Sequence, residues 1–305
     1  MAASRQLRVA LVGAGHMGRL HARTIAARED AHLVAVCDVD AAAAAALADA
    51  HGARVRRDVC DLVGEVDAVV LAAATSAHRD LALSLIRAGI PLLVEKPLAG
   101  TAAEAREIAR AAERAGAILQ VGHILRFDPV TRALAGRTFQ PTRIAVSWRS
   151  PFTGRSTDVS VVMDLAIHGI DLVLKWAGDM PEEVTATGRT VKGPHADEVE
   201  AHLEFAGGCV ANLFASRVSE TRERRIRITA GSETIELDYA ARTVRWGSEA
   251  LPVETGPDAL TAQMNAFLAA VRGEAPVAVS ADEGARAVEV ADRIHEAVAK
   301  GQGKA

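Results

Sequence analysis

Aromatic residues are scarce in this 305-residue chain: they make up 3% of it, with a single tyrosine, Tyr239. The scarcity argues against a carbohydrate-binding module built on stacked aromatic side chains and against single-stranded nucleic-acid binding through base stacking. Because 50% of the residues are hydrophobic all the same, the core must consist largely of Ala, Val, Leu and Ile. Such a core is typical of parallel strands buried between helices.

Cysteine is also rare. The three cysteines, Cys37, Cys60 and Cys209, are too few and too scattered for a disulfide framework or a four-ligand zinc site. We therefore interpret them as buried, reduced thiols of a cytoplasmic protein, and we expect no metal site.

Long apolar runs and an excess of positive charge are missing as well. No run approaches the roughly 18 apolar residues that a membrane span requires, and the first six residues lead straight into an apolar segment. We expect neither a membrane span nor a secretory signal. With 35 basic and 39 acidic residues the formal net charge is −4, so nucleic acid is not an expected partner.

The length predicts two domains. From residue 7 to about 120, short apolar runs alternate with helical stretches, a pattern that indicates an α/β domain with a doubly wound parallel sheet. After about residue 125, alternating segments separated by turns predict a second, α+β domain with a mainly antiparallel open sheet. The expected domains are residues 1–123 and 124–305.

Helices are predicted from their end signals. Thr101 with Glu104, and Ser280 with Glu283, have the spacing of capping boxes. Asp40 is a cap candidate for the alanine-rich stretch that follows it. The last two helices are expected at about residues 260–272 and 281–300.

A glycine-rich turn follows the first expected strand. Gly13, Gly15 and Gly18 form G-x-G-x-x-G between a strand and a helix, the context in which this pattern indicates dinucleotide binding. Asp38 ends the second strand, where a carboxylate accepts hydrogen bonds from the adenosine ribose and disfavours a 2′-phosphate. NAD is therefore favoured, with NADP as an alternative if a cation such as Arg19 accepts the phosphate. The alternative interpretation is a glycine-rich turn that binds no ligand.

The fifth expected strand ends in Glu95-Lys96-Pro97. Ligands of open parallel sheets bind beyond the carboxyl ends of the strands, so Lys96 is expected to face the cofactor crevice. Its ammonium group would hydrogen-bond a substrate hydroxyl and stabilise alkoxide character. The alternative is a solvated lysine beside Glu95.

A polar stripe marks the helix expected at about residues 161–177. Asp164, His168, Asp171 and Lys175 are spaced four, three and four residues apart, on one helical face. The chemical interpretation is an Asp-His dyad in which Asp164 orients the imidazole and His168 removes a hydroxyl proton. The alternative is an ordinary solvated surface with an Asp-Lys pair.

Together these segments resemble the glucose-fructose oxidoreductase, inositol dehydrogenase and MocA family of NAD(P)-dependent oxidoreductases. The matching segments are GAGHMG, VCDVD, the T-x-x-H of Thr75 to His78, LLVEKPLAG, VGHILRFDP and MDLAIHGID. The resemblance implies a Rossmann domain followed by an α/β domain whose open sheet forms subunit contacts, in a homo-dimer or homo-tetramer. It also implies catalysis by Lys96, Asp164 and His168.

Further site residues are implied by the resemblance alone. On the cofactor side they are His16 and Met17 at the pyrophosphate turn, Thr75 and His78 at the nicotinamide half, and Glu95 with Lys96 at the crevice. On the substrate side they are Lys96, Arg126, Asp164, His168 and Asp171.

The chain departs from the family pattern at two positions. Ala74 stands where the family commonly has proline, and Gly169 stands where it commonly has an acidic residue. The segments around VGHILRFDP and MDLAIHGID look more like the branch that oxidises nucleotide-linked amino sugars or their uronates at C3 than like the inositol dehydrogenases. Arg149, Arg155 and Arg217 are candidates for binding a diphosphate or carboxylate, or are solvated surface residues.

The sequence thus predicts a cytoplasmic NAD-dependent dehydrogenase that moves hydride between a secondary alcohol of a sugar, inositol or nucleotide sugar and nicotinamide. One alternative is a keto-sugar or imine reductase with the same site. The other is a catalytically silent NAD-binding sensor or scaffold. A sugar ring is expected to be held by hydrogen bonds and charge, with little stacking.

Overall fold

The computed structural model describes residues 5–154 and 159–302. The chain divides into two compact units: Met1–His123 with Leu260–Ala285 form the first, and Ile124–Ala259 with Arg286–Ala305 form the second. Among the described residues, no helix is long and apolar enough to cross a membrane.

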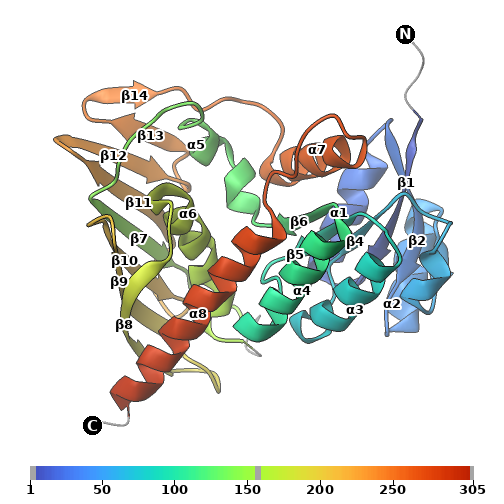
Figure 1. The fold of residues 1–305 in the computed structure, drawn as a ribbon, viewed down its shortest axis with the longest axis horizontal. Helices are drawn as coiled ribbons and strands as arrows, with labels where there is room; N and C mark the ends of the chain where they lie inside the picture. The colour runs from blue at the N-terminus through green and yellow to red at the C-terminus, as the bar shows by residue number, and fades with distance from the viewer. Residues whose placement is uncertain (1–4, 155–158, 303–305) are drawn as a thin grey trace. The chain divides into compact units, whose positions relative to one another are not determined.

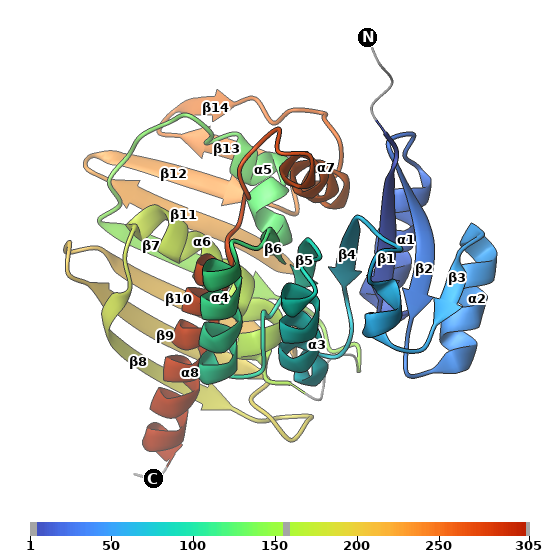
Figure 2. The same cartoon turned by 45° about the vertical axis from the view of Figure 1, so that its right-hand side comes forward.

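The first unit contains a six-stranded parallel sheet in the order β3-β2-β1-β4-β5-β6 (Figure 1). This confirms the predicted doubly wound fold. Helices α3 and α4 lie side by side in Figures 1 and 2. The elements are β1 (Leu7–Val12), α1 (His16–Ala26), β2 (Ala31–Cys37), α2 (Ala41–His51), β3 (Arg54–Arg56), η1 (Val59–Leu62), β4 (Ala68–Leu71), α3 (Thr75–Arg87), β5 (Leu92–Glu95), α4 (Ala102–Ala115), β6 (Leu119–Gly122) and α7 (Ala259–Val271).

The predicted caps form at Asp40 and Ser280, and of the capping box predicted for Thr101 and Glu104 the structure shows the Thr101 half. The Asp40 side chain accepts from the amides of Ala42 and Ala43 at the start of α2, and Thr101 Oγ1 accepts from Glu104 N at 3.3 Å. At the start of α8 (Ala281–Gln302), Ser280 and Glu283 form a reciprocal capping box. These local bonds fix where the helices begin.

Helix α7 joins the first unit although it follows the second domain in sequence. Met264, Phe267 and Leu268 are fully buried in the same cluster as Ile25 of α1 and Leu47 of α2, and Arg272 binds Asp30 at 2.8 Å. The expected division of the chain at residue 123 therefore does not describe the C-terminal segment, because burial of α7 returns residues 260–285 to the first sheet.

The second unit contains an eight-stranded, mainly antiparallel sheet in the order β14-β13-β12-β11-β7-β10-β9-β8. One face, called the inner face here, packs against η3 and α6. The mainly antiparallel sheet confirms the predicted α+β architecture, with one parallel pair, β7 and β10. The elements are η2 (Ile124–Phe127), α5 (Pro129–Arg132), β7 (Arg143–Arg149), η3 (Val162–Ala166), α6 (Ile167–Ala177), β8 (Pro181–Arg189), β9 (Glu198–Phe205), β10 (Val210–Ser216), β11 (Glu223–Ala230), β12 (Glu233–Asp238), β13 (Thr243–Trp246), β14 (Glu249–Leu251) and most of α8.

Two features of this unit have no counterpart in the predicted pattern. Strand β8 is at the edge of the sheet and mostly half-buried or exposed, so its sequence lacks a strong apolar alternation. The helix predicted at residues 161–177 begins with a π-helical segment, η3, before α6. A π-helical turn changes the angular spacing of the residues that it contains.

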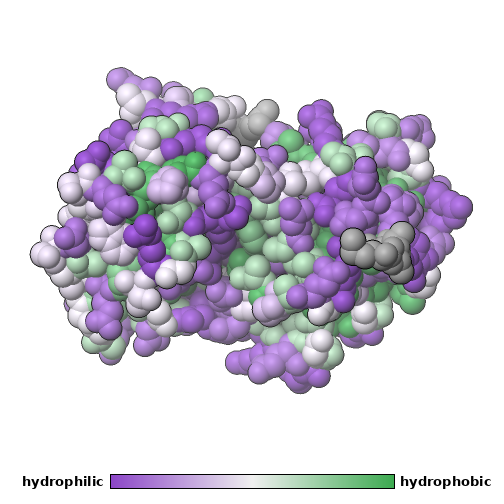
Figure 3. Space-filling model, turned by 90° about the horizontal axis from the view of Figure 1, so that it is seen from above, coloured by the Kyte–Doolittle hydropathy of each residue, from purple (hydrophilic) through white to green (hydrophobic). Residues whose placement is uncertain are grey.

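The surface carries few exposed large apolar side chains. In Figure 3, hydrophilic and hydrophobic residues are interspersed on the face shown. Among the described residues, the exposed large hydrophobics are Val39, Val55, Val63, Phe152 and Val191.

The cysteines are free, and Cys37 and Cys209 are buried, but Cys60 is exposed. The prediction that all three are buried was therefore wrong for Cys60. The reason is local: η1 buries Val59 and Leu62, so Cys60 lies on the outer side of that turn.

Candidate active site

The three glycines of the turn have different surroundings. Gly13 has φ +104°, and a Cβ there would lie 2.4 Å from the carbonyl oxygen of Ala72. A Cβ on Gly18 would lie 1.9 Å from the carbonyl oxygen of Gly13. No atom lies within 4 Å of a Cβ built on Gly15. Gly13 and Gly18 are thus required by packing, whereas the space above Gly15 is open to a ligand.

Helix α1 begins directly at this open space. Gly15 is its N-cap residue, no side chain caps it, and no acidic residue lies in its first turn. Its first amide groups and the positive end of the helix dipole are therefore available to a phosphate. His16 is exposed and Met17 half-buried at this helix start. The residues present fit the pyrophosphate of a dinucleotide.

Asp38 follows β2 and is bonded to the glycine turn. Its Oδ2 accepts from Ala14 N at 2.5 Å and its Oδ1 accepts from Asp40 N at 2.8 Å. Arg19 donates to the carbonyl oxygen of Ala14 at 3.1 Å. The carboxylate is thereby held where two strands end.

A cavity of about 390 Å³ adjoins Gly13, Gly15 and Asp38. Its polar lining includes Arg57, a cation that sequence reasoning did not single out. The only sequence signal for Arg57 is its position after the third strand, at the same edge of the sheet. The full lining is Val12, Gly13, Gly15, Cys37, Asp38, Val39, Arg57, Asp58, Val59, Ala72, Ala73, Ala74, Ala77 and Leu81.

His78 is buried in α3 and bridges two loops. Its Nδ1 lies 3.0 Å from the carbonyl oxygen of Pro97, and its Nε2 lies 3.0 Å from that of Ala73. Burial lowers the pKa of His78, and the two carbonyl contacts oppose this effect only in part. His78 thus ties the segment after β5 to the loop before α3, while Thr75 is the half-buried first residue of α3.

Glu95 and Lys96 stand at the end of β5. Glu95 is buried, and its Oε1 lies 2.7 Å from Nε2 of the fully buried His21. Burial by itself would raise the pKa of Glu95, but the hydrogen bond with His21 and the charges of His21 and Lys96 outweigh it, so the pKa is lowered. His21 is a site neighbour that sequence reasoning missed.

In the second unit, Asp164 lies in the π-helical segment η3 and His168 in the first turn of α6. Both side chains are half-buried. The segment is anchored by Ser160, whose Oγ lies 2.5 Å from Nε2 of His295 on α8. The rest of the predicted stripe differs in environment, since Asp171 is buried and Lys175 is exposed.

The two substrate-side candidates Arg126 and Asp171 are bonded to each other. Arg126 Nε and Nη2 donate to the two carboxylate oxygens of Asp171 at 2.7 and 2.8 Å, and both side chains are almost fully buried. Gly169 faces the sheet, because a Cβ there would lie 2.7 Å from Val146 and 2.9 Å from Trp148. Its departure from the family pattern is therefore a packing feature of α6 against β7.

The arginines proposed for anionic groups have other partners. Arg217 is buried and binds Asp197 at 2.7 Å, so its guanidinium is part of the core. Arg149 lies 3.3 Å from Glu223 and 4.4 Å from the ring of Phe214. Arg155 lies outside the described residues.

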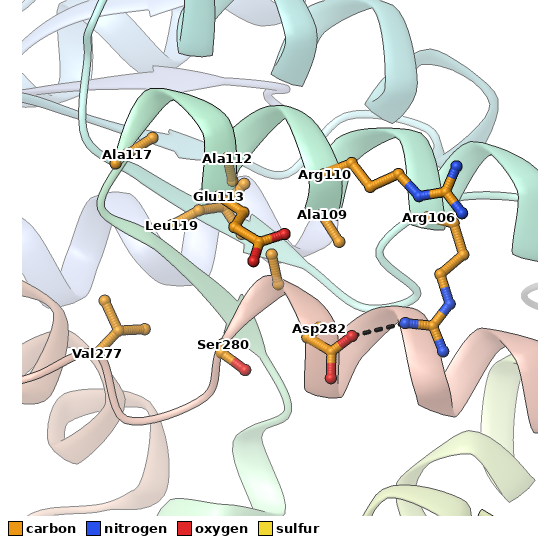
Figure 4. Close-up of a pocket in the computed structure, with 12 residues that line it drawn as sticks. Arg106, Ala109, Arg110, Ala112, Glu113, Ala117, Leu119, Val277, Ser280 and Asp282 are labelled. Carbon is orange, nitrogen blue, oxygen red and sulfur yellow. Dashed lines mark hydrogen bonds and ion pairs between the residues drawn. The ribbon is translucent and has the colours of Figure 1, made fainter.

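A second cavity of the first unit, of about 560 Å³, lies between α4 and the start of α8 (Figure 4). Arg106 reaches Asp282 across it at 2.6 Å, with Arg110 and Glu113 on the α4 side. None of the predicted site residues lines it. Within residues 5–154 and 159–302, His, Cys, Asp and Glu side chains form no group that could hold a metal ion.

Two family models match the chain. The model of the oxidoreductase family with an NAD-binding Rossmann fold covers residues 7–123, and the model of the GFO/IDH/MocA C-terminal domain covers residues 132–236. The first match agrees with the glycine turn and Asp38, and it identifies the cofactor as NAD.

Similar proteins are dehydrogenases. UDP-N-acetylglucosamine 3-dehydrogenase of Acidithiobacillus ferrooxidans is 33% identical over 96% of this chain and 97% of that protein. Its solved structure has a TM-score of 0.90 and covers 96% of this chain and 98% of the other. Inositol 2-dehydrogenase of Rhizobium meliloti is 29% identical over 96% of this chain and 97% of its own length. The chain belongs to the Gfo/Idh/MocA family of NAD-dependent oxidoreductases.

Proposed function

We propose that this enzyme oxidises a secondary alcohol of a sugar, inositol or nucleotide sugar. His168 is the base, Asp164 is the carboxylate that orients it, and the charge of Lys96 stabilises the alkoxide that develops. The observation that carries the proposal is the open space above Gly15, beside the Asp38 carboxylate, which fits a dinucleotide. The same chain has Lys96 at the end of β5 and the D-x-x-x-H element of Asp164 and His168.

The chemistry divides between cofactor and protein. NAD, when bound, supplies the acceptor for the hydride. The free amides at the start of α1 and the Asp38 carboxylate bind the dinucleotide. In the proposed site His168 takes the hydroxyl proton, and the charge of Lys96 stabilises the developing alkoxide.

Substrate class is inferred from the relatives. One is named as a UDP-N-acetylglucosamine 3-dehydrogenase and another as an inositol 2-dehydrogenase. We propose a nucleotide sugar as the substrate, because the relative with that activity is 33% identical over nearly the whole chain. We further propose that cofactor-side contacts come from His16, Met17, Thr75, His78 and Glu95, and that Arg126 and Asp171 shape the substrate side.

The test uses Lys96→Ala and His168→Ala, with Lys175→Ala, an exposed residue of the same helix, as a control. Turnover is followed by absorbance of the reduced cofactor, with UDP-N-acetylglucosamine and myo-inositol as substrates. Loss of a catalytic acid–base group costs about 10²- to 10⁴-fold in kcat, while the Kd of NAD should change little. Near-normal kcat in both variants would contradict the assignment.

Two alternatives have distinct outcomes. A keto-sugar or imine reductase would use the same residues in the opposite direction, and oxidation of NADH by such substrates would reveal it. A catalytically silent sensor would bind NAD tightly and turn over none of these compounds.

We also propose self-association through the outer face of the second sheet, the face opposite α6. Acidic Glu200 and Glu204 are exposed on β9, and basic Arg225 and Arg227 are exposed on β11. A two-fold axis would place opposite charges against each other. Sedimentation should give a dimer or tetramer, weakened by reversing the charge of Glu200 and Glu204. A monomer at all concentrations would disprove this.

A further inference from the structure

Strand β11 carries a cation on the inner face of the second sheet. Arg224 lies directly opposite Trp148 in the ladder between β11 and β7, and residues directly opposite in an antiparallel pair point to the same face. Trp148 contacts α6, because its Nε1 lies 2.9 Å from a Cβ built on Gly169. Arg224 therefore lies on the face to which α6 brings His168.

The charged surroundings of Arg224 agree with this placement. The carboxylates of Asp164 and Asp128 both act on its charge, and Arg222 adds a second cation. Partial desolvation by the surrounding protein lowers the pKa of Arg224, the charge of Arg222 acts in the same direction, and the two carboxylates oppose them. Arg224 is thus electrostatically coupled to Asp164, the proposed orienting carboxylate.

Arg224 differs from the other arginines of its strand. Arg225 and Arg227 point to the outer face and bind Asp238 and Glu236, each at 2.7 Å. Among the residues that the structure describes, no carboxylate lies within ion-pair distance of Arg224, and more than a third of its surface is exposed. An arginine in this situation retains its donors for a ligand.

The wall beside Arg224 is aromatic. Trp148 and Tyr239 meet edge to face, with ring centroids 5.4 Å apart, and Tyr239 N donates to the carbonyl oxygen of Arg224 at 2.9 Å. The only tyrosine of the chain thus fixes the backbone at this arginine. The two aromatic rings thus lie beside a cation on the inner face of the sheet.

We propose that Arg224, assisted by Arg222, binds an anionic group carried by the sugar substrate, a phosphate or a carboxylate, and so selects charged sugars over neutral polyols. This inference rests on the proposed function. The planar guanidinium donates two parallel hydrogen bonds to either group, which gives both affinity and orientation.

The test compares Arg224→Gln with Arg245→Gln, a matched change at an exposed arginine on the outer face of the same sheet, on β13. Calorimetry in the presence of NAD measures Kd for UDP and for D-glucuronate, and steady-state kinetics uses UDP-N-acetylglucosamine and myo-inositol. Arg224→Gln should raise the Kd of one of the two anions roughly 10- to 100-fold, the loss of affinity expected when charge-assisted hydrogen bonds are removed. If the affected anion is UDP, the KM for UDP-N-acetylglucosamine should rise. The kcat for this substrate, and both KM and kcat for myo-inositol, should change less than about threefold.

Each outcome has one meaning. A selective loss of UDP binding identifies a diphosphate ligand, and a selective loss of glucuronate binding identifies a carboxylate. Unchanged Kd values for both anions, or equal effects of Arg224→Gln and Arg245→Gln, would overturn the proposal. A fall in kcat with both substrates would also overturn it, because Arg224 would then act through Asp164.

Two further readouts keep the test decisive. Arg224→Lys retains the charge but not the paired donors, so it should recover part of the anion affinity even if Arg224→Gln folds poorly. Because calorimetry needs no turnover, a wild-type protein that binds UDP and oxidises no sugar would refute the proposed function and leave the anion site standing.

Discussion

His21 Nε2 lies 2.7 Å from Oε1 of Glu95, and both side chains are buried in the first unit. Gly122 leaves room for this pair, because a Cβ there would lie 3.0 Å from the Glu95 carboxyl group. The amide of Lys96 lies 3.3 Å from the other carboxylate oxygen. The residue before the proposed catalytic lysine is thus fixed by a buried hydrogen bond to α1.

His21→Ala should destabilise the protein by about 3–5 kcal/mol at pH 7, because it leaves a buried carboxylate without its partner. The wild-type pKa of Glu95 is lowered, so its contribution is present above the unfolded pKa and is lost as pH falls through the folded pKa. The difference between wild type and variant in urea unfolding should therefore shrink toward pH 4. The double variant His21→Ala/Glu95→Gln should recover part of the loss; equal losses at pH 7 and 4 would contradict this account.

Gly15→Ala should mainly weaken NAD binding, whereas Gly18→Ala should mainly lower thermal stability. Gly18→Ala should lower the Tm strongly, because its Cβ overlaps the Gly13 carbonyl, whereas Gly15→Ala meets no atom of the protein and should cost at most about 1 kcal/mol at the helix cap. Gly15→Ala should instead raise the Kd of NAD at least about tenfold, because its methyl group occupies the ligand's side of the turn. Thermal unfolding and NADH fluorescence titration measure the two effects. Normal NAD binding by Gly15→Ala would place the pyrophosphate elsewhere.

Asp38→Asn should weaken NAD about tenfold and reduce discrimination against NADP, because the carboxylate that repels a 2′-phosphate is removed. Arg57, which lines the same cavity, would then be a candidate to bind that phosphate. The control is Asp40→Asn, a helix cap of α2, which should leave the NAD/NADP ratio unchanged. The ratio of kcat/KM for the two cofactors is the measurement; an unaltered ratio in Asp38→Asn would exclude this role.

Ala74→Pro should stabilise the protein by about 0.5–1 kcal/mol, because Ala74 has φ −61°, a value that proline also adopts. The matched control is Ala77→Pro, three residues further along α3, where the amide donates to the carbonyl oxygen of Ala74 at 2.9 Å. That change should destabilise the protein, because proline has no amide hydrogen to donate in this bond. Chemical denaturation of both variants tests the pair, and a loss of stability in Ala74→Pro would show that the loop before α3 needs the Ala74 amide.

Arg217→Met should reduce stability by about 3–5 kcal/mol at pH 7, because it leaves the buried Asp197 carboxylate without its cation. Burial by itself would raise the pKa of Asp197. Hydrogen bonds from three backbone amides and Arg217 lower it by a larger amount, so the pKa lies well below its usual range. Wild-type stability from this group is therefore present above about pH 4 and is lost on acidification. Asp197→Asn should flatten the stability profile below pH 4. The affinity for UDP and D-glucuronate should not change in Arg217→Met. A large change would show that Arg217 takes part in substrate binding.

The glycine turn and the helix caps were predictable from the sequence because each depends on residues close together in the chain. The parallel sheet was predictable from the alternation of short apolar runs with helical stretches. Gly13, Gly15 and Gly18 span six residues, and Asp40 caps the helix that starts directly after it. The edge strand β8 was not predictable, because its half-exposed residues carry no strong apolar pattern. The π-helical segment at Asp164 was not predictable either, because helical periodicity assumes the same number of residues in every turn.

The sequence by itself determined the nucleotide-binding fold, the cofactor and the residues that carry the proposed chemistry, because those signals are local motifs in a recognisable order. Only the tertiary structure decided which charged side chains pair with one another. Arg126 and Arg217 are held by buried carboxylates, whereas Arg224 shares the inner face with Trp148 without such a partner among the described residues. The physical reason is that the partner of a charge is set by which distant strands and helices meet, and residue spacing along the chain does not record it.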